Sequence, residues 1–372
     1  MRAVIVGGGI GGLCAARALH QGGWDVTVLE RAPRFSEVGA GITLMANALA
    51  GLDALGLGDA VRAQGRVDAP GGTRTPDGRW LARIDAALLE KTLGTAALGI
   101  HRATLHGILR AALPASVLVA GAAVSDVTPG SVVSTAGTFA ADLIVGADGI
   151  DSVVRRRLWP LTPPPAYAGT TAWRGVTDEP WTGALNVAIT WGRGAEFGMV
   201  PLGDGRVYWF GAVKAPAGVR AADERAAVRE LFGAWHDPVP ALIDATTTVL
   251  HHDLRHLASP LPTYVRGNVV LLGDAAHAMT PNLGQGGAQA IEDAVVLGNA
   301  CSVSRPLSEA LADYDARRRP RSQSVAAASY RIGRFGQQLT NPVLVAARNA
   351  AIRLTPPRVA LRSMARYADW RP

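Results

Sequence analysis

Hydrophobic positions along the chain follow the period of a helix in some segments and that of a strand in others. At the amino end, an apolar run predicts a buried strand over 2–6. Apolar residues three and four apart then predict a helix over 11–21, and a second strand is expected over 24–30. This order is the βαβ unit of a parallel sheet. Similar patterns predict a helix over 104–113 and strands over 117–120, 131–134, 143–146 and 268–273.

The middle of the chain alternates with a period of two. Four strands are predicted there, over 170–176, 185–191, 196–201 and 206–213. A Gly-Asp-Gly turn at 203–205 joins the last two as a hairpin. These strands predict an antiparallel sheet, entered through the proline-rich crossing at 160–165 and followed by a helix near 222–235.

Composition narrows the class of protein. The 372 residues are 48% hydrophobic and 18% charged, which is typical of a globular chain. The net charge of +7 comes almost wholly from arginine, since Lys91 and Lys214 are the only lysines, and we interpret it as a solvated surface and not a nucleic-acid site. Cys14 and Cys301 fall in apolar helical patterns and are predicted to be buried thiols. The chain shows no signal peptide and no apolar run of about 18 residues, so we expect it in the cytoplasm, without a transmembrane segment.

A glycine motif lies between the first strand and the first helix. Gly7 is placed for the tight turn, Gly9 for close approach of a pyrophosphate, and Gly12 for packing of helix on strand. Glu30 ends the second strand, where a carboxylate accepts hydrogen bonds from ribose hydroxyls and repels a 2′-phosphate. The motif therefore predicts FAD or NAD and not NADP, with Arg31, the next residue, as a further candidate contact.

A second glycine-rich stretch follows the strand predicted over 268–273. Its candidate cofactor contacts are Gly273, Asp274, Pro281, Gly284, Gly286 and Gly287. Asp274 comes directly after a buried strand, where a carboxylate needs hydroxyl or amide partners. The glycines let a flat ring lie on backbone, and the next helix begins there with its positive end toward that ring. Gly41, in a shorter glycine-rich turn, is expected to line the ring similarly, whereas His277 is interpreted as a structural residue. The two glycine-rich stretches together suit a long, bent cofactor such as FAD.

Two further features complete the pattern: Arg102 at the start of a helix, and the run Asp148-Gly149-x-x-Ser152-x-x-Arg155. Alone, the run is equally an ordinary turn that caps a helix. In this order and spacing, however, the motifs resemble those of single-component flavoprotein monooxygenases, the aromatic hydroxylases similar to salicylate and p-hydroxybenzoate hydroxylases. The resemblance covers about residues 1–330. It implies that Glu30 binds the adenosine ribose, that Arg102 lies by the ribose and pyrophosphate, that Asp148 belongs to a segment used by both FAD and NAD(P)H, and that Asp274 holds the ribityl hydroxyls.

The expected fold class is α/β, with a Rossmann-like FAD-binding domain, an inserted antiparallel β-sheet substrate domain and C-terminal helices. The FAD-binding domain is predicted from 1–70, 98–165 and 262–320, and the substrate-binding sheet domain from 71–97 and 166–261. The C-terminal helices take up 321–372 and are expected to brace the two domains. We expect the helices of this part of the chain to break at Pro306, Pro320, Pro342 and Pro356–Pro357.

Candidate substrate contacts lie on the predicted sheet. The period of two places Glu196 on one face of its strand, and Tyr208 and Phe210 together on one face of the next. Arg174 resembles part of a strand motif common in the family and is suited to an anionic group. Packing within the sheet is an equally good interpretation of all four residues. Trp209 facing the pocket in place of Tyr208 is the competing arrangement.

No metal site and no catalytic residue is assigned. His251, His252 and His256 are close in sequence, but no helical pattern or cysteine joins them into a set of metal ligands.

The predicted reaction consumes NADH or NADPH and O₂ and inserts one oxygen into a small aromatic or polyketide-like substrate through a flavin hydroperoxide, with FAD bound non-covalently. The alternatives are an epoxidase or reductase of the same fold, or a non-catalytic flavin-binding redox or interaction protein. A halogenase is disfavoured, because neither lysine has the expected context and no Trp-x-Trp motif occurs. The protein is expected to be a monomer or homodimer.

Overall fold

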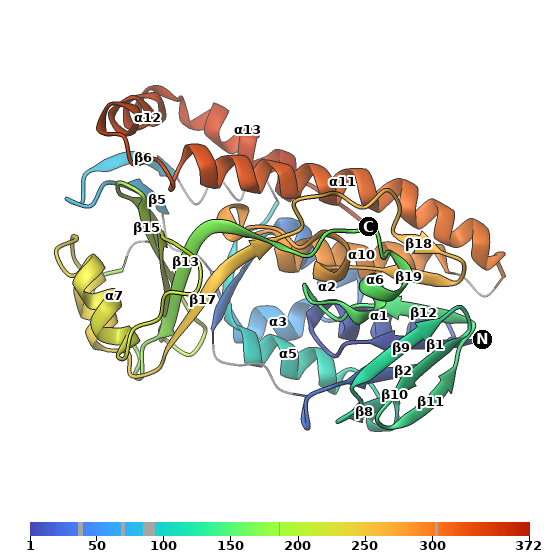
Figure 1. Cartoon of the computed structure of the whole chain (residues 1–372). Helices are drawn as coiled ribbons and strands as arrows, with labels where there is room; N and C mark the ends of the chain where they lie inside the picture. Colours follow the sequence, from blue (N-terminus) through green and yellow to red (C-terminus); the bar gives the residue numbers. More distant parts are fainter. Residues whose placement is uncertain (36–39, 68–70, 85–93, 186, 302–303) are drawn as a thin grey trace.

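The structure is a computed structural model that describes residues 1–35, 40–67, 71–84, 94–185, 187–301 and 304–372. It is an α/β protein in which two large sheets lie at opposite ends of the molecule, with a long helix running along both (Figure 1).

The first sheet is the predicted nucleotide-binding sheet. Its order is β18-β19-β12-β1-β2-β8, and all neighbours are parallel except β18 and β19. The strands are β1 (Arg2–Val6), β2 (Asp25–Glu30), β8 (Leu118–Ala120), β12 (Leu143–Gly146), β18 (Val265–Arg266) and β19 (Val269–Leu271). Because β19 pairs with β12 beside β1, the chain does return to this sheet after leaving it. Helix α1 (Ile10–Gln21) packs on α10 (Gly286–Ala300).

Smaller elements surround this sheet. An antiparallel sheet is formed by β9 (Val124–Thr128), β10 (Ser131–Ser134) and β11 (Gly137–Ala140), and another by β3 (Gly41–Leu44), β4 (Arg66–Val67) and β7 (Leu98–His101). The helical elements are α2 (Ala46–Ala54), α3 (Gly58–Gln64), α5 (Arg102–Ala111), η1 (Ala115–Val117), α6 (Val153–Leu158), α9 (Asp274–His277) and η2 (Pro281–Leu283). Several of these short strands are not predicted by the hydrophobic pattern, because each has too few residues to show a period.

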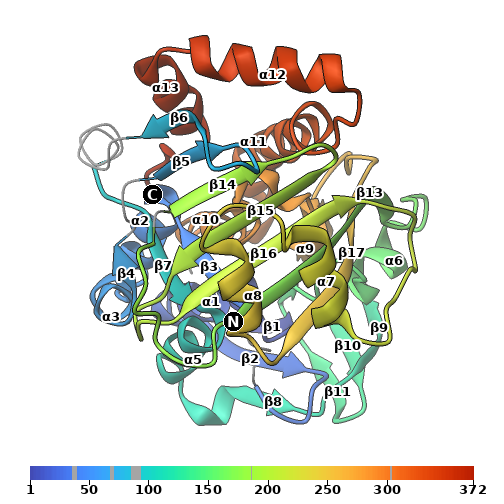
Figure 2. The ribbon, with the colours of Figure 1, turned by 90° about the vertical axis from the view of Figure 1, so that its left-hand side faces the viewer.

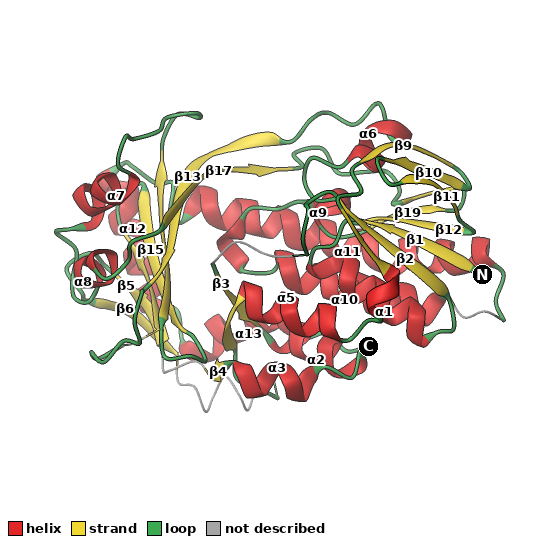
Figure 3. Ribbon diagram, turned by 90° about the horizontal axis from the view of Figure 1, so that it is seen from below, coloured by secondary structure: helices red, strands yellow, loops and turns green. Residues whose placement is uncertain are grey.

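The second sheet has seven strands, in the order β17-β13-β16-β15-β14-β5-β6. They are β5 (Gly71–Arg74), β6 (Trp80–Ile84), β13 (Ala166–Val176), β14 (Val187–Trp191), β15 (Ala195–Pro201), β16 (Val207–Lys214) and β17 (Val249–His256). The hairpin β15–β16 confirms the turn predicted at 203–205. Helices α7 (Glu224–Phe232) and α8 (Val239–Asp244) cover the face turned away from the first sheet (Figure 3). The strands within 71–84 belong to this sheet, while the domain boundaries themselves stay a prediction.

Three helices end the chain: α11 (Leu307–Phe335), α12 (Pro342–Leu354) and α13 (Pro357–Ala368). The break expected at Pro320 was wrong, because α11 continues through it. Proline removes one backbone hydrogen bond from a helix interior. Helix α11 packs on α10, and Arg318 before this position and Arg321 after it both form ion pairs with Glu292 of α10, which holds the helix together here.

The largest apolar core lies between the first sheet and helices α1, α2, α5 and α10. Cys14 and Cys301 belong to it as free thiols, as predicted, and burial raises the pKa of each to about 12. Within the described part of the chain, no helix has both the length and the apolar character needed to span a bilayer.

Candidate functional site

The three glycines of the first motif have different surroundings. Gly7 has a φ of +108°, and a Cβ on it would lie 2.4 Å from the Ala147 carbonyl oxygen. A Cβ on Gly12 would lie 1.9 Å from the Gly7 carbonyl oxygen, so only glycine lets α1 begin this close to β1. A Cβ on Gly9, by contrast, would meet nothing within 4 Å. The turn is thus tight at its first and third glycines and open at its second, where a phosphate must approach the backbone.

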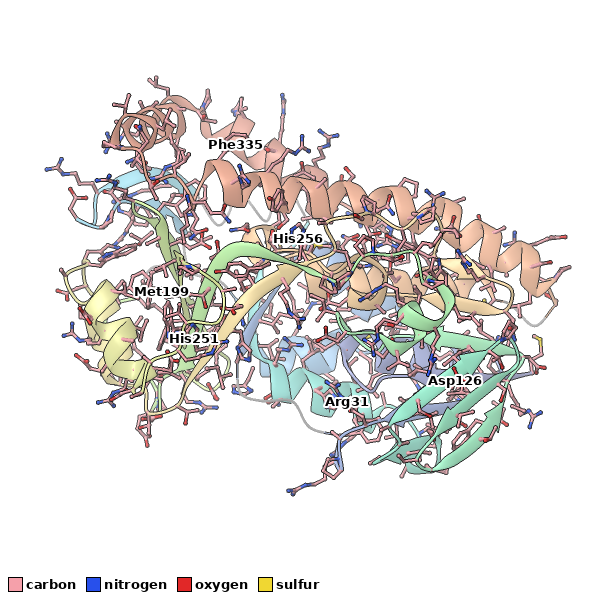
Figure 4. All side chains as sticks on the ribbon, viewed as in Figure 1. Arg31, Asp126, Met199, His251, His256 and Phe335 are labelled. Atoms are coloured by element: carbon pink, nitrogen blue, oxygen red, sulfur yellow. The ribbon has the colours of Figure 1, made fainter. Side chains whose placement is uncertain are left out.

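The end of β2 is fixed against this turn. The Glu30 carboxylate accepts hydrogen bonds from the backbone N–H of Gly8 and of Ala32, each at 2.8 Å. Arg31 is exposed beside it (Figure 4). His106 of α5, which sequence reasoning missed, is buried with its Nε2 2.8 Å from the Gly8 carbonyl oxygen. The only signal for His106 is its place one turn after Arg102, which begins α5 as predicted.

Asp148 caps α6. Its carboxylate accepts hydrogen bonds from the Ser152 hydroxyl at 2.6 Å and from the backbone N–H of Val153 at 2.6 Å and of Val154 at 3.2 Å. Burial raises the pKa of Asp148, and these hydrogen bonds oppose that rise. The Asp148 carboxylate therefore caps α6, as in the helix-capping turn that was the alternative interpretation of this run. A cofactor contact of Asp148 stays a prediction.

The segment after β19 exposes one carboxylate. Asp274 is exposed, while Gly273 before it and Ala275 after it are buried. Gly273 has a φ of +57°, and its N–H donates to Asp293 Oδ2 at 2.9 Å. The buried guanidinium of Arg155 donates to the Ala275 carbonyl oxygen at 2.9 Å, which ties the segment around Asp148 to this one. Asp274 is thus held by its backbone with its side chain toward solvent, as a ligand contact requires.

A network of buried charged side chains holds the segment after β19 in place. His277 Nε2 lies 2.6 Å from Asp293 Oδ2, and Arg318 donates to Asp293 Oδ1 at 2.7 Å and to Glu292 at 2.5 Å. Burial alone would raise the pKa of Asp293, but the charges of His277 and Arg318 lower it to about 2. His277 fastens the turn, as predicted. The partners of His277 were not predicted; the signal for them is the pair of adjacent acids, Glu292 and Asp293, in an apolar helix, which demands a buried cation.

The start of α10 is open to a ligand. Gly284 has a φ of +64°, and a Cβ on Gly286 would meet nothing within 4 Å, whereas one on Gly287 would lie 2.9 Å from Ile42. Pro281 begins the short helix η2 just before this turn. No side chain caps α10, a helix of 15 residues, and no acid lies in its first turn. Its first N–H groups and its dipole therefore favour an anionic or electron-rich group.

The second sheet turns the face that carries the predicted substrate contacts toward the glycine-rich loop before α10. In the strand register, Tyr208 lies opposite Val200, and Phe210 lies opposite both Arg174 and Gly198. Residues that pair directly share one face of a sheet. Glu196, two positions before Gly198, is on that face as well. The face assignment of these residues is confirmed, while their contact with a substrate stays a prediction.

Strand β3 meets the same face. A Cβ on Gly41 would lie 2.4 Å from Tyr208 Cβ, so the absence of a side chain brings the two sheets into contact there. Tyr208 packs with Ala40, Val200 and Leu202. A flavin contact of Gly41 stays a prediction. Gly39, the other glycine of this predicted turn, lies outside the described residues. Burial raises the pKa of Tyr208, while the nearby charges of Arg174 and Arg102 lower it by less. Because the net shift is upward, the phenol stays protonated at neutral pH.

Glu196 connects the sheet to the glycine-rich loop. It is only 5% exposed, and it accepts a hydrogen bond from Trp191 Nε1 at 3.0 Å and a long one from Asn282 of η2 at 3.5 Å. Burial raises the pKa of Glu196 to about 7, although the bond from Trp191 lowers it. A carboxyl group with such a pKa can give or take a proton near neutral pH.

Two of the three clustered histidines have ring partners elsewhere. His251 stacks on Trp173 with ring centroids 4.3 Å apart and lies 2.6 Å from the Thr171 hydroxyl, while His256 stacks on Tyr330. In the described part of the chain, no group of three His, Cys, Asp or Glu side chains is arranged to hold a metal ion.

These residues fit FAD. Open space adjoins Gly9 at one end of the candidate site and Gly286 at the other end, as an extended dinucleotide would need. Glu30 lies at the first end, and the exposed Asp274 and the uncapped helix α10 lie at the second. The fold and the site define an FAD-dependent oxidoreductase.

Comparisons with known proteins agree. The family described as "FAD binding domain" matches residues 1–329. Aurachin C monooxygenase/isomerase of Stigmatella aurantiaca is 41% identical over 343 residues, covering 90% of this chain and 89% of that protein. The 2-heptyl-3-hydroxy-4(1H)-quinolone synthase of Pseudomonas aeruginosa is 34% identical, covering 96% and 94%. Klebsiella pneumoniae HpxO, solved with FAD and uric acid, has a TM-score of 0.91 at 29% identity, covering 99% and 96%. The chain belongs to the single-component FAD-dependent aromatic hydroxylases and is a monooxygenase.

Proposed function

We propose that this enzyme uses NADH or NADPH and O₂ to insert one oxygen atom into an electron-rich aromatic ring, and that it works in the cytoplasm. One of its relatives is named for a quinolone, which favours a fused, nitrogen-containing bicyclic ring as substrate. The observation that carries the proposal is that the face of the second sheet bearing Tyr208 contacts β3 at Gly41. Glu196, on the same face, accepts a hydrogen bond from Asn282 of the glycine-rich loop.

When bound, FAD supplies the oxygen chemistry, through reduction by NAD(P)H and then a flavin hydroperoxide. The protein residues place the substrate and exclude water. Tyr208 and Phe210 form an aromatic wall for a flat ring, and the protonated phenol of Tyr208 can donate a hydrogen bond to it. Arg174 supplies positive charge on the same face for an oxyanion of the substrate. Glu196 can take or return one ring proton.

The test is consumption of NADH and of NADPH by the FAD-loaded enzyme with a panel of aromatic compounds, including 4-quinolones and salicylates. Substrate should stimulate consumption, and mass spectrometry should find a product with one added oxygen, labelled when ¹⁸O₂ is used. Label arriving wholly from water would overturn the mechanism. A labelled epoxide in place of a phenol would redirect the proposal to epoxidation, which uses the same oxygen chemistry.

The cofactor contact of Asp274 is tested separately. Asp274→Ala should weaken FAD retention about ten- to a hundredfold, because a hydrogen bond to a charged group is worth about 1.5–3 kcal/mol. Asp25→Ala, at the exposed start of β2, is the matched control. Equal FAD affinity in both variants, measured by titrating the apoprotein, would remove Asp274 from the site.

A further inference from the structure

Helix α12 buries a charged residue and exposes apolar ones, which is the opposite of an ordinary surface helix. Its one buried residue is Arg348, whose guanidinium donates to the carbonyl oxygens of Gly336 at 2.6 Å and Gly192 at 3.2 Å. It also lies over the Trp191 ring at 5.4 Å. A surface helix normally buries apolar residues and exposes charged ones. Here the charged residue anchors the helix, and most of the apolar residues are left outside.

The outward face of α12 is an apolar stripe. Val343, Ala347, Ala350 and Leu354 follow the helical spacing of one face, and all four are exposed. Val343 is 73% and Leu354 81% exposed, and Leu344 beside the stripe is 52% exposed. Phe335, at the end of α11, is 70% exposed (Figure 4). Figure 2 shows α12 along the top of the molecule, beyond β5 and β6. Clustered exposed apolar side chains on an outermost helix mark an interaction surface.

The part of the chain that carries this stripe is strongly basic. From 330 to 368 the sequence contains no aspartate or glutamate. The exposed arginines of this part of the chain are Arg331, Arg334, Arg353, Arg358, Arg362 and Arg366. A pocket of about 470 Å³ adjoins the stripe at Leu344 and is lined by Lys214, Arg334 and Tyr167, with no carboxylate among its lining residues. The partner of this surface must therefore combine negative charge with an apolar interior.

We propose that α12 and the arginines around it dock the enzyme on an anionic phospholipid bilayer. Val343, Leu344 and Leu354 enter the headgroup region, while the arginines meet lipid phosphates and the pocket at Lys214 and Arg334 receives one headgroup. A helix with an apolar face and arginines around it suits the bilayer interface. A second copy of the chain fits less well, because it would bring the same arginines against one another.

The experiment uses the FAD-loaded enzyme and vesicles of phosphatidylcholine alone or mixed with phosphatidylglycerol. Flotation should show binding to the mixed vesicles only, lost at high salt. Val343→Glu combined with Leu354→Glu should weaken binding at least about tenfold, since two apolar side chains no longer enter the interface. Leu161→Glu, at a 94% exposed position far along the chain from α12, is the control and should bind like the parent. Arg353→Gln, Arg358→Gln and Arg362→Gln together should weaken binding about a hundredfold.

Flavin absorbance and circular dichroism show whether each variant is folded, and each exposed position tolerates the change without a buried contact to lose. Absence of binding to mixed vesicles overturns the proposal, and so does equal binding to both vesicle types. A dimer in light scattering that the Val343→Glu and Leu354→Glu pair dissociates would assign the face to a second copy. Tighter binding to a DNA duplex than to vesicles would assign it to nucleic acid.

Discussion

The two faces of the seven-stranded sheet are built from alternating residues of the same strands, yet they differ in almost every property. One face carries Phe197 and Trp209, nearly parallel with centroids 5.5 Å apart, beneath α7 and α8. The other carries Arg174, Glu196 and Tyr208 and meets β3 and the glycine-rich loop. Figure 3 shows α7 and α8 on one side of the sheet and the nucleotide-binding domain on the other.

The difference shows how one sheet serves stability and chemistry at once. On the helix-covered face, the fully buried Trp209 donates its Nε1–H to the Thr246 hydroxyl at 2.8 Å. On the face toward β3, burial raises the pKa of Glu196 and of Tyr208, and the Arg174 guanidinium and the Phe210 ring lie on the same face. Perturbed groups that converge on one surface are typical of functional sites. Neighbouring positions in one strand should therefore respond differently to substitution.

The largest effect is expected at Trp209. Trp209→Ala should lower the free energy of unfolding by about 3–5 kcal/mol, because it empties a fully buried site and removes the hydrogen bond that Trp209 donates to the Thr246 hydroxyl. Urea denaturation of the FAD-loaded enzyme measures this loss. Phe210→Ala, one residue further and half-buried on the other face, should cost clearly less. Equal losses would mean that the two faces do not differ in stability.

Glu196 should make stability depend on pH. Its pKa is raised from 4.5 to about 7, so the folded state binds the proton more tightly than the unfolded state. Stability should therefore fall as pH rises from about 4.5 to about 7 and level off above that, by on the order of 2–3 kcal/mol. Glu196→Gln should remove this dependence, whereas Glu309→Gln, at an exposed position of α11, should keep it. A difference between wild type and Glu196→Gln that does not change with pH would contradict the assignment.

Gly41→Ala tests the contact between the sheets. The new Cβ would lie 2.4 Å from Tyr208, so the phenol must move, at a cost of about 1–3 kcal/mol. Stability should fall accordingly, and product formed per NAD(P)H consumed should drop as the aromatic wall shifts. Gly107→Ala in α5, where a Cβ meets nothing within 4 Å, is the control: it should leave the product yield unchanged and should not lower stability. An unchanged product yield in Gly41→Ala would show that Tyr208 does not border the substrate.

The smallest effect is expected at the Tyr208 hydroxyl. Tyr208→Phe should raise KM or lower the product yield per NAD(P)H by about two- to twelve-fold, the loss of one hydrogen bond of about 0.5–1.5 kcal/mol, while FAD stays bound. Trp209→Phe should change stability and leave coupling intact, because Trp209 faces α7 and α8. The reverse outcome, with coupling disturbed only in Trp209→Phe, would exchange the roles of the two faces.

Much of this site follows from local spacing. The turn at Gly7, the packing at Gly12 and the alternation that separates Tyr208 from Trp209 depend on residues close together in sequence, and each prediction was confirmed. Such features are set by backbone sterics and by the two-residue period of a strand. The contacts of Asp274 and Arg31 with FAD stay predictions that follow from the same spacing.

The sequence by itself determined the nucleotide-binding turn, the return of the chain to the first sheet, and which strand residues share a face. Tertiary structure alone decided that Glu196 meets Asn282, that Arg318 neutralises Glu292 and Asp293, and that α11 continues through Pro320. It also turned Arg348 inward and left the apolar face of α12 outside. The reason is physical: propensity and period act between near neighbours. The partner of a buried charge, the fate of a proline in a packed helix and the exposed face of a helix depend on what packs against them from elsewhere in the chain.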